Sequence, residues 1–228
     1  MFNKSNNSVD FIPAKESRLF IRFFRIYVKL LFKRRFKKVW ISQDYKPSKT
    51  SRTVYYLNHN SWWDGLIPLM LNEYRFKQQA RALMEDKQMK KFSFFKRIGA
   101  FSINLDDPRK TITSLRYAVK SIERDHSCLF VYPEGQIQAQ GSDLNFKQGL
   151  SWIHGKVESV DFVPIGIYIH TIRHDKPELH IKVGKPIDMG QKKSNKEKTS
   201  IFQKNLSMIL QKLKTTAGFD DSCYETFL

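Results

Sequence analysis

The chain has 228 residues, a length within reach of a single α/β core, and 41% of its residues are hydrophobic. It carries 40 Lys and Arg against 22 Asp and Glu, and this formal net charge of +18 favours anionic partners such as bilayers, nucleic acid, phosphorylated cofactors or an acidic carrier protein. Its two cysteines, Cys128 and Cys223, are too few and too far apart for a disulfide framework or a metal site.

The N-terminal residues give no sign of a targeting segment. Residues 1–10 are polar, and arginines interrupt the apolar residues that follow, so this end does not resemble a signal peptide. No run of about 18 uncharged apolar residues is present anywhere, which argues against a transmembrane helix. We therefore expect a cytoplasmic protein.

Residues 18–40 predict a basic amphipathic helix. Its cations recur every three or four residues and form one ridge, whereas aromatic and aliphatic residues form a wide apolar face. The ridge consists of Arg18, Arg22, Arg25, Lys29 and Lys33. Such a helix is typical of the membrane interface, and the alternative is a helix packed on the domain with its cations in solvent. We expect residues 1–40 to form a helix that binds an anionic membrane surface, and residues 41–228 to form the main domain.

Strands and helices alternate beyond a polar linker at residues 42–53. Apolar or β-branched runs predict strands at residues 53–57, 81–84, 101–104, 128–132, 160–168 and 178–183. Helices are predicted after Asp64, through Met89, from Asp107 to about Arg124, and over residues 201–213 after a polar loop at residues 190–200. This alternation predicts an α/β fold, a single-domain sandwich with a central, mostly parallel sheet flanked by helices.

His59 and Asp64 form the most informative pair in the chain. His59 follows the strand predicted at residues 53–57, at the end of the strand where open α/β sheets bind ligands. Four residues separate it from Asp64, which lies at the start of a predicted helix and can turn back toward the imidazole. A carboxylate there fixes the tautomer of a histidine that acts as a general base. The alternative is an ordinary turn or helix-cap pair.

Several short motifs in a fixed order resemble the glycerolipid (lysophosphatidic-acid type) acyltransferase superfamily. They are His59 with Asp64, the segments 99–104, 132–135 and 146–149, the run Val163-Pro164-Ile165, and the turn at residues 184–187. The resemblance covers roughly residues 40 to 190. It implies that residues 41–228 form an acyltransferase domain.

The resemblance implies acyl transfer from a thioester, acyl-CoA or acyl carrier protein, to the hydroxyl of a lysophospholipid such as 1-acylglycerol-3-phosphate. His59 would be the general base and Asp64 its orienting group. The residues implied in substrate binding are Asn104, Arg109, Glu134, Gly135 and Gln136. No metal, cofactor or nucleic acid is expected, and the protein would lie on the inner face of the cell membrane.

Two positions depart from the family pattern. Leu105 stands where the family usually has an arginine, and Gln136 stands where it usually has a threonine before another cation. Both positions are associated with the acceptor, whose phosphate needs a cation, and Arg109 is the nearest one. An acceptor without phosphate, an amino-lipid or a glycolipid, therefore stays open. So does a non-catalytic basic module that binds anionic lipid or nucleic acid.

Three histidines late in the chain lie outside these motifs. His170, His174 and His180 have no carboxylates at metal-ligand spacing beside them, and we expect surface or structural roles for all three. We expect Cys128 to be a buried strand residue.

Overall fold

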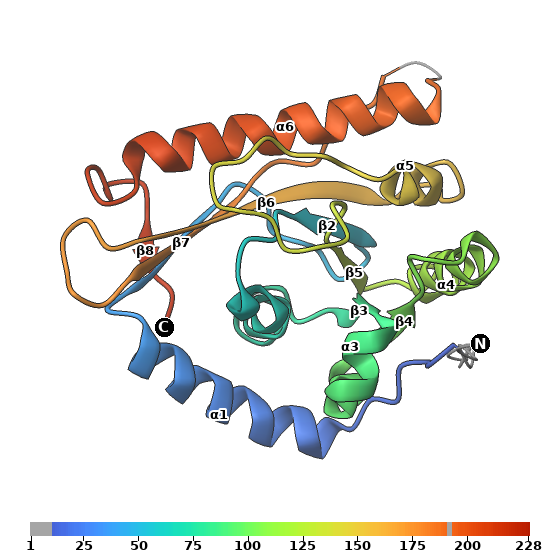
Figure 1. Ribbon diagram of the computed structural model, residues 1–228, viewed down its shortest axis with the longest axis horizontal. Helices are drawn as coiled ribbons and strands as arrows, with labels where there is room; N and C mark the ends of the chain where they lie inside the picture. The colour runs from blue at the N-terminus through green and yellow to red at the C-terminus, as the bar shows by residue number, and fades with distance from the viewer. Residues whose placement is uncertain (1–10, 191–192) are drawn as a thin grey trace, which may run out of the picture.

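An eight-stranded β-sheet lies between two layers of helices (Figure 1). The structure is a computed structural model that describes residues 11–190 and 193–228, so the predicted polar segment at residues 1–10 lies outside the described residues. The strand order is β4–β3–β5–β2–β6–β7–β1–β8. The strands are β1 Val39–Gln43, β2 Thr53–Leu57, β3 Gln79–Glu85, β4 Ala100–Ile103, β5 Ser127–Val131, β6 Asp161–His170, β7 Glu178–Val183 and β8 Glu225–Thr226.

The sheet has a parallel part and a mixed part. All neighbours from β4 through β3, β5 and β2 to β6 pair in parallel. The antiparallel pairs are β6 with β7 and β1 with β8, whereas β1 and β7 are parallel. The predicted α/β sandwich with a mostly parallel central sheet is therefore confirmed.

The helices divide between the two faces of the sheet. One face carries α1 Arg18–Arg35, the 3₁₀ turn η1 Trp62–Leu66, α2 Ile67–Leu71, the π-helical turn η2 Asn72–Phe76, α3 Asp86–Lys91 and η3 Ser93–Ile98. The other face carries α4 Pro108–Ser121, α5 Gly149–His154 and α6 Asn195–Thr216. In Figure 1, α1 and α6 lie on opposite sides of the sheet.

Helix α1 has apolar residues on two opposite sides. Its inner side packs Val28 and Phe32 into the core, both with no exposed surface. Its outer side exposes a stripe of large apolar side chains, and we call this set the outer stripe: Leu19, Phe23, Ile26, Tyr27 and Leu30. The predicted helix is therefore present, packed on the domain and also apolar toward solvent.

The structure corrects several predicted boundaries. Residues 39–43, assigned from sequence to the helix end and the linker, form strand β1, where Ile41 pairs with Ile181 of β7. The short helix α5 and the C-terminal strand β8 were not predicted. Helix α6 begins at Asn195 rather than near residue 201, because Ser194 and Glu197 form a capping box at its start.

Two of the three late histidines are buried rather than superficial. His180 has no exposed surface, and its Nε2 lies 2.9 Å from Oδ1 of Asp221. The ring centroid of His170 lies 5.0 Å from that of His180, and burial lowers the pKa of both imidazoles. These two histidines tie the C-terminal segment to β6 and β7. Cys128 is buried as predicted, and neither cysteine forms a disulfide.

No helix in the described part of the chain has the length and hydrophobicity needed to cross a membrane.

Candidate active site

The loops that carry the predicted site residues leave the sheet at one edge. Strands β2 and β5 are parallel neighbours in which Tyr56 pairs with Val131, so the loops that follow them emerge together. The loops after β3 and β4 leave at the same edge, because these strands continue the parallel set. This edge is where open α/β sheets place their ligands.

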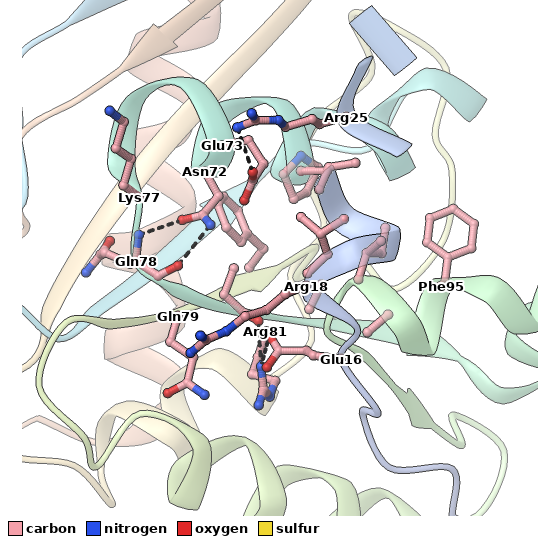
Figure 2. Close-up of a pocket in the computed structure, with 18 of the residues that line it drawn as sticks. Glu16, Arg18, Arg25, Asn72, Glu73, Lys77, Gln78, Gln79, Arg81 and Phe95 are labelled. Carbon is pink, nitrogen blue, oxygen red and sulfur yellow. Dashed lines mark hydrogen bonds and ion pairs between the residues drawn. The ribbon is translucent and has the colours of Figure 1, made fainter. Parts of the chain in front are cut away.

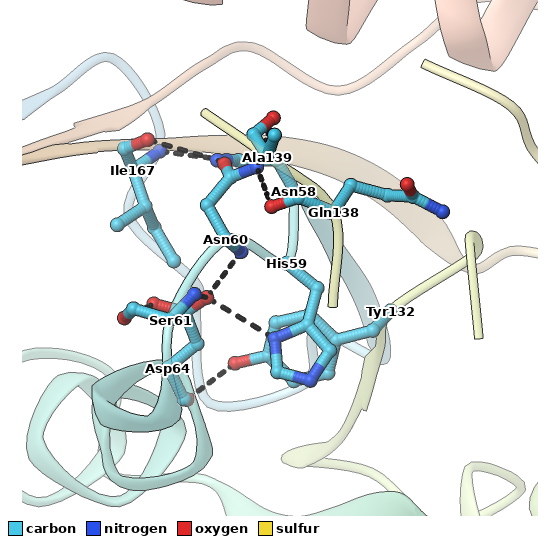
Figure 3. A network of polar contacts seen from close by, with 9 residues as sticks. All are labelled: Asn58, His59, Asn60, Ser61, Asp64, Tyr132, Gln138, Ala139 and Ile167. Atoms are coloured by element: carbon cyan, nitrogen blue, oxygen red, sulfur yellow. Dashed lines mark hydrogen bonds and ion pairs between the residues drawn. The ribbon is translucent and has the colours of Figure 1, made fainter. Parts of the chain in front are cut away.

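His59 and Asp64 are in contact (Figure 3). Nδ1 of His59 lies 3.1 Å from Oδ2 of Asp64, and the His59 side chain keeps 21% of its surface exposed. Because an ionised carboxylate only accepts hydrogen bonds, this contact favours the neutral tautomer that carries its proton on Nδ1, and in that tautomer Nε2 can accept a proton. The predicted pair therefore has the geometry of a base and its orienting carboxylate.

The Asp64 carboxylate is fully buried and satisfied by local donors. Its Oδ2 accepts from the backbone N–H of Asn60 at 2.7 Å and of Ser61 at 2.8 Å, and its Oδ1 accepts from the Ser61 hydroxyl at 2.7 Å. Ser61 and Asp64 form a capping box at the start of η1. Asp64 therefore caps η1 and contacts His59 at the same time, and the catalytic role of the pair stays a prediction.

The loop after β5 supports the loop that carries His59. The Tyr132 ring lies 4.5 Å from the His59 ring, centroid to centroid, and its hydroxyl donates to the backbone carbonyl of Asp64. The N–H of Gln138 donates to the His59 carbonyl at 2.8 Å, and Asn60 Nδ2 donates to the Gln138 carbonyl at 3.0 Å. The two loops therefore form one unit around the imidazole.

Glu134 is a buried carboxylate at this edge. It has 2% of its surface exposed, and neither carboxylate oxygen has a hydrogen-bond partner among the described residues. Burial raises the pKa of this carboxyl, and the backbone N–H groups of His59 and Asn145, which lie near it without reaching hydrogen-bonding geometry, offset only part of the shift. A buried, unpartnered carboxyl is costly, and such groups are concentrated at functional sites.

Gly135 brings two further residues to the site. It adopts a φ of +72°, which favours glycine, and a Cβ there would lie 3.1 Å from Nζ of Lys147 and 3.4 Å from Cδ1 of Leu105. The Lys147 N–H donates to the Pro133 carbonyl at 2.9 Å, which fixes the two segments together. Lys147 was not among the predicted site residues, although it belongs to the motif at residues 146–149.

The other predicted binding residues are placed less favourably. Asn104 uses its amide inside the chain: Nδ2 donates to Asp86 at 2.6 Å, and Oδ1 accepts from the N–H groups of Asp106 and Asp107. Arg109 lies exposed in the first turn of α4, and Gln136 is exposed in the loop after Gly135. No ion pair joins Arg109 to a described residue, and its role stays a prediction. The described residues also contain no cluster of His, Cys, Asp and Glu suited to a metal ion.

Comparisons with known proteins give a family and a similar fold for the chain. The chain matches the acyltransferase family over residues 38–173. Its fold is similar to the crystal structure of the 1-acyl-sn-glycerophosphate (LPA) acyltransferase PlsC from Thermotoga maritima, with a TM-score of 0.62 and 18% identity over 86% of this chain and 81% of that one. Among curated proteins, no sequence matches the chain at a significant level.

The raised pKa of Glu134 predicts a pH-dependent effect on stability. Below the pKa of about 4.3 that glutamate has in the unfolded chain, Glu134 is neutral in both the folded and the unfolded state. At higher pH the folded state keeps the proton that the unfolded state has lost. The free energy of unfolding therefore falls as the pH rises through the pKa of the folded state. Glu134→Gln should therefore raise the free energy of unfolding at pH 8, with a gain that disappears near pH 4. Urea denaturation across this range measures it, with the exposed Glu158→Gln as control. A Glu134→Gln protein less stable than the wild type at pH 8 would contradict the raised pKa of Glu134.

Proposed function

Since the chain belongs to the acyltransferase family, we propose that it transfers a fatty acyl group from a thioester, acyl-CoA or acyl carrier protein, to a lysophospholipid such as 1-acylglycerol-3-phosphate. The observation that carries the proposal is the contact between His59 and the buried Asp64 at the ligand-binding edge of the sheet. The similar fold of PlsC from Thermotoga maritima, a 1-acyl-sn-glycerophosphate (LPA) acyltransferase, supports the choice of acceptor.

In the proposed mechanism, Nε2 of His59 takes the proton from the acceptor hydroxyl as its oxygen attacks the thioester carbonyl. The buried Asp64 carboxylate stabilises the imidazolium that forms. The tetrahedral oxyanion then collapses, the carbon–sulfur bond breaks, and the imidazolium returns its proton to the leaving thiolate. The acceptor supplies the hydroxyl nucleophile, so the chain needs no nucleophilic serine or cysteine.

Lys147 supports a phosphate-bearing acceptor. Its ammonium lies beside Gly135, and the nearby Asp106 carboxylate pairs with Lys87 at 2.7 Å instead. An exposed ammonium that forms no ion pair with any described residue suits a phosphate oxygen. Leu105 favours the alternative acceptor, an amino-lipid or a glycolipid, because it presents an apolar side chain to the same glycine.

The outer stripe of α1 supports a position on an anionic membrane surface. Leu19 is 80% exposed and Phe23 is 68% exposed, beside a ridge of cations. Each basic residue near anionic lipid contributes about 1 kcal/mol, and buried apolar area adds to that. We propose peripheral binding to the inner face of the cell membrane, where a lysolipid acceptor is found.

A non-catalytic basic module is the competing proposal. The net charge of +18 would suit such a protein, with anionic lipid or nucleic acid as its ligand. Charge alone, however, does not account for a buried carboxylate that contacts Nδ1 of a histidine whose side chain is 21% exposed.

The histidine is tested by substitution. His59→Ala should lower the turnover of acyl-CoA with 1-acylglycerol-3-phosphate about 10²–10⁴-fold, the usual loss for a general base. His174→Ala is the matched control. Thioester cleavage is followed through the released thiol, with mass spectrometry of the acylated lipid. Near wild-type turnover in His59→Ala would defeat the mechanism, and no acyl transfer by the wild-type protein to any acceptor in a lipid panel would favour the binding module.

The phosphate contact is tested with two acceptors. Lys147→Ala should raise the KM for 1-acylglycerol-3-phosphate about 10- to 100-fold, as expected for a lost charge-assisted hydrogen bond, and should leave a monoacylglycerol acceptor nearly unaffected. Arg109→Ala removes the exposed cation that the sequence predicts as the phosphate contact, and it should change either KM little if Lys147 is the contact instead. A phosphate-selective loss in Arg109→Ala instead would make Arg109 the contact. Equal losses for both acceptors would indicate a structural role.

The outer stripe is tested without removing α1, because Val28 and Phe32 are part of the core. Phe23→Ser with Leu30→Ser should weaken binding to phosphatidylglycerol vesicles in a sedimentation assay. Met208→Ser with Phe219→Ser removes two similarly exposed apolar residues elsewhere, 59% and 73% exposed, and should not. If the α1 variant bound vesicles as well as the control variant, the outer stripe would have no role in membrane binding.

A further inference from the structure

A cavity of about 840 Å³ lies between α1 and the sheet, on the face that also carries α2 and η3 (Figure 2). Its floor consists of small side chains: Ala80 and Ala82 point to the same face of β3, and Ala100 is the partner of Ala82 on β4. Ile98 and Phe95 of η3 form an apolar wall. Alanine at three neighbouring floor positions leaves space that larger residues would fill.

The opening of the cavity is strongly basic. Figure 2 shows Arg18 and Arg81 on one side and Arg25 and Lys77 on the other. Arg81 pairs with Glu16, and Arg25 pairs with Glu73 at 3.4 Å. Nε of Arg25 is buried and has no hydrogen-bond partner among the described residues.

Four cations of the lining remain available to a ligand, because they form no ion pair within residues 11–190 and 193–228. They are Arg18 and Arg22, one helical turn apart on α1, together with Lys77 and Arg124. A cavity with an apolar floor and wall and with unpaired guanidinium groups at its opening is complementary to a molecule with an apolar chain and an anionic head.

The cavity is distinct from the candidate active site. It opens beside Gln79, the first residue of β3, and residues 124–126, which precede β5. These are the N-terminal ends of parallel strands, whereas His59 and Glu134 follow C-terminal ends. The lining reaches inward to Gly65, which follows Asp64 in sequence, but it includes neither His59 nor Glu134.

We propose that this cavity binds one single-chain lipid with an anionic head group, its chain over Ala80 and Ala82 and its carboxylate or phosphate against Arg18, Arg22 and Arg124. The volume lies within the range of about 300–1,000 Å³ typical of small-ligand sites, which suits one chain and its head group. The site does not depend on acyl transfer, and it is an addition to the acceptor site proposed above.

The position of the cavity also provides a source for the ligand. The arginines of α1 at its opening adjoin the outer stripe, in which Leu19 and Phe23 are exposed. If α1 lies on a bilayer, as proposed above, these arginines lie at the level of the lipid head groups. An anionic lipid can then enter from the membrane surface with its head group already paired.

The test is a fluorescence titration of the full-length protein with cis-parinaric acid, a fluorescent single-chain carboxylate, in the absence of any acyl donor. We expect one bound molecule per chain. Dodecanoate and dodecyl phosphate should both displace it, and their relative strength distinguishes a fatty-acid ligand from a lipid phosphate. Dodecanol, which has the same chain and no charge, should displace it at least tenfold less well.

Two sets of variants locate the site. Ala82→Phe fills the chamber and should weaken parinaric acid binding at least tenfold, and Ala80→Leu serves as the second filling variant if Ala82→Phe is unstable in thermal denaturation. Arg18→Gln with Arg22→Gln should weaken the anionic ligands about 10- to 100-fold and dodecanol little. The control Lys196→Gln with Lys204→Gln removes the same charge from α6, on the other face of the sheet, and should have no effect.

The proposal has clear contrary outcomes. Unchanged affinity in a folded filling variant would overturn it, because the probe would then bind elsewhere. Equal weakening by the α6 lysine variant would also overturn it, because the effect would then be general electrostatic attraction. The titration contains no acyl donor, so its result is independent of whether His59→Ala abolishes acyl transfer.

Discussion

The buried carboxylate of Asp64 is the constraint on which the candidate site depends. Removing a carboxylate from water is costly unless donors replace the lost solvent, and here two backbone N–H groups, the Ser61 hydroxyl and the His59 imidazole do so. All four donors lie within residues 59–61, so satisfying one charge determines the path of the whole loop. The orientation of His59 is therefore a consequence of folding, and the free enzyme already holds it before any substrate binds.

The parallel part of the sheet brings the other groups to this charge. Neighbouring parallel strands end at the same edge, so the loops after β2 and β5 meet although their residues are about seventy positions apart in sequence. Tyr132 and Gln138 then donate hydrogen bonds to backbone carbonyls in the segment after β2. Such contacts do not depend on the side chains of that segment. Rigid strands thus position the site, and backbone contacts between the loops make it a single unit.

Local sequence patterns predicted the features that depend on local physics. The apolar runs of β2 and β5 and the spacing of His59 from Asp64 are readable because burial and one turn of chain determine them. Strand β1 was missed, since five residues after a basic cluster have no period that distinguishes a strand, and its pairing with β7 is long-range. The position of Lys147 beside Gly135 likewise depends on a contact between the Pro133 carbonyl and a segment that follows a long loop. Arg109 was chosen from sequence distance alone, and its role stays a prediction.

Helix α1 shows where folding energetics do not account for the sequence. Val28 and Phe32 explain its inner side, since their burial stabilises the domain. The outer stripe gains nothing from folding, because Leu19, Phe23 and Leu30 stay in water. Single exposed apolar residues are ordinary, but several on one side of a helix, flanked by arginines, form a patch of the kind that marks an interaction surface.

The same arginines line the opening of the cavity beneath the helix, so a single ridge of charge borders both the outer stripe and the proposed lipid site. A bilayer would cover the outer stripe, and the chain of a bound lipid would cover the apolar floor of the cavity. The protein itself covers neither surface.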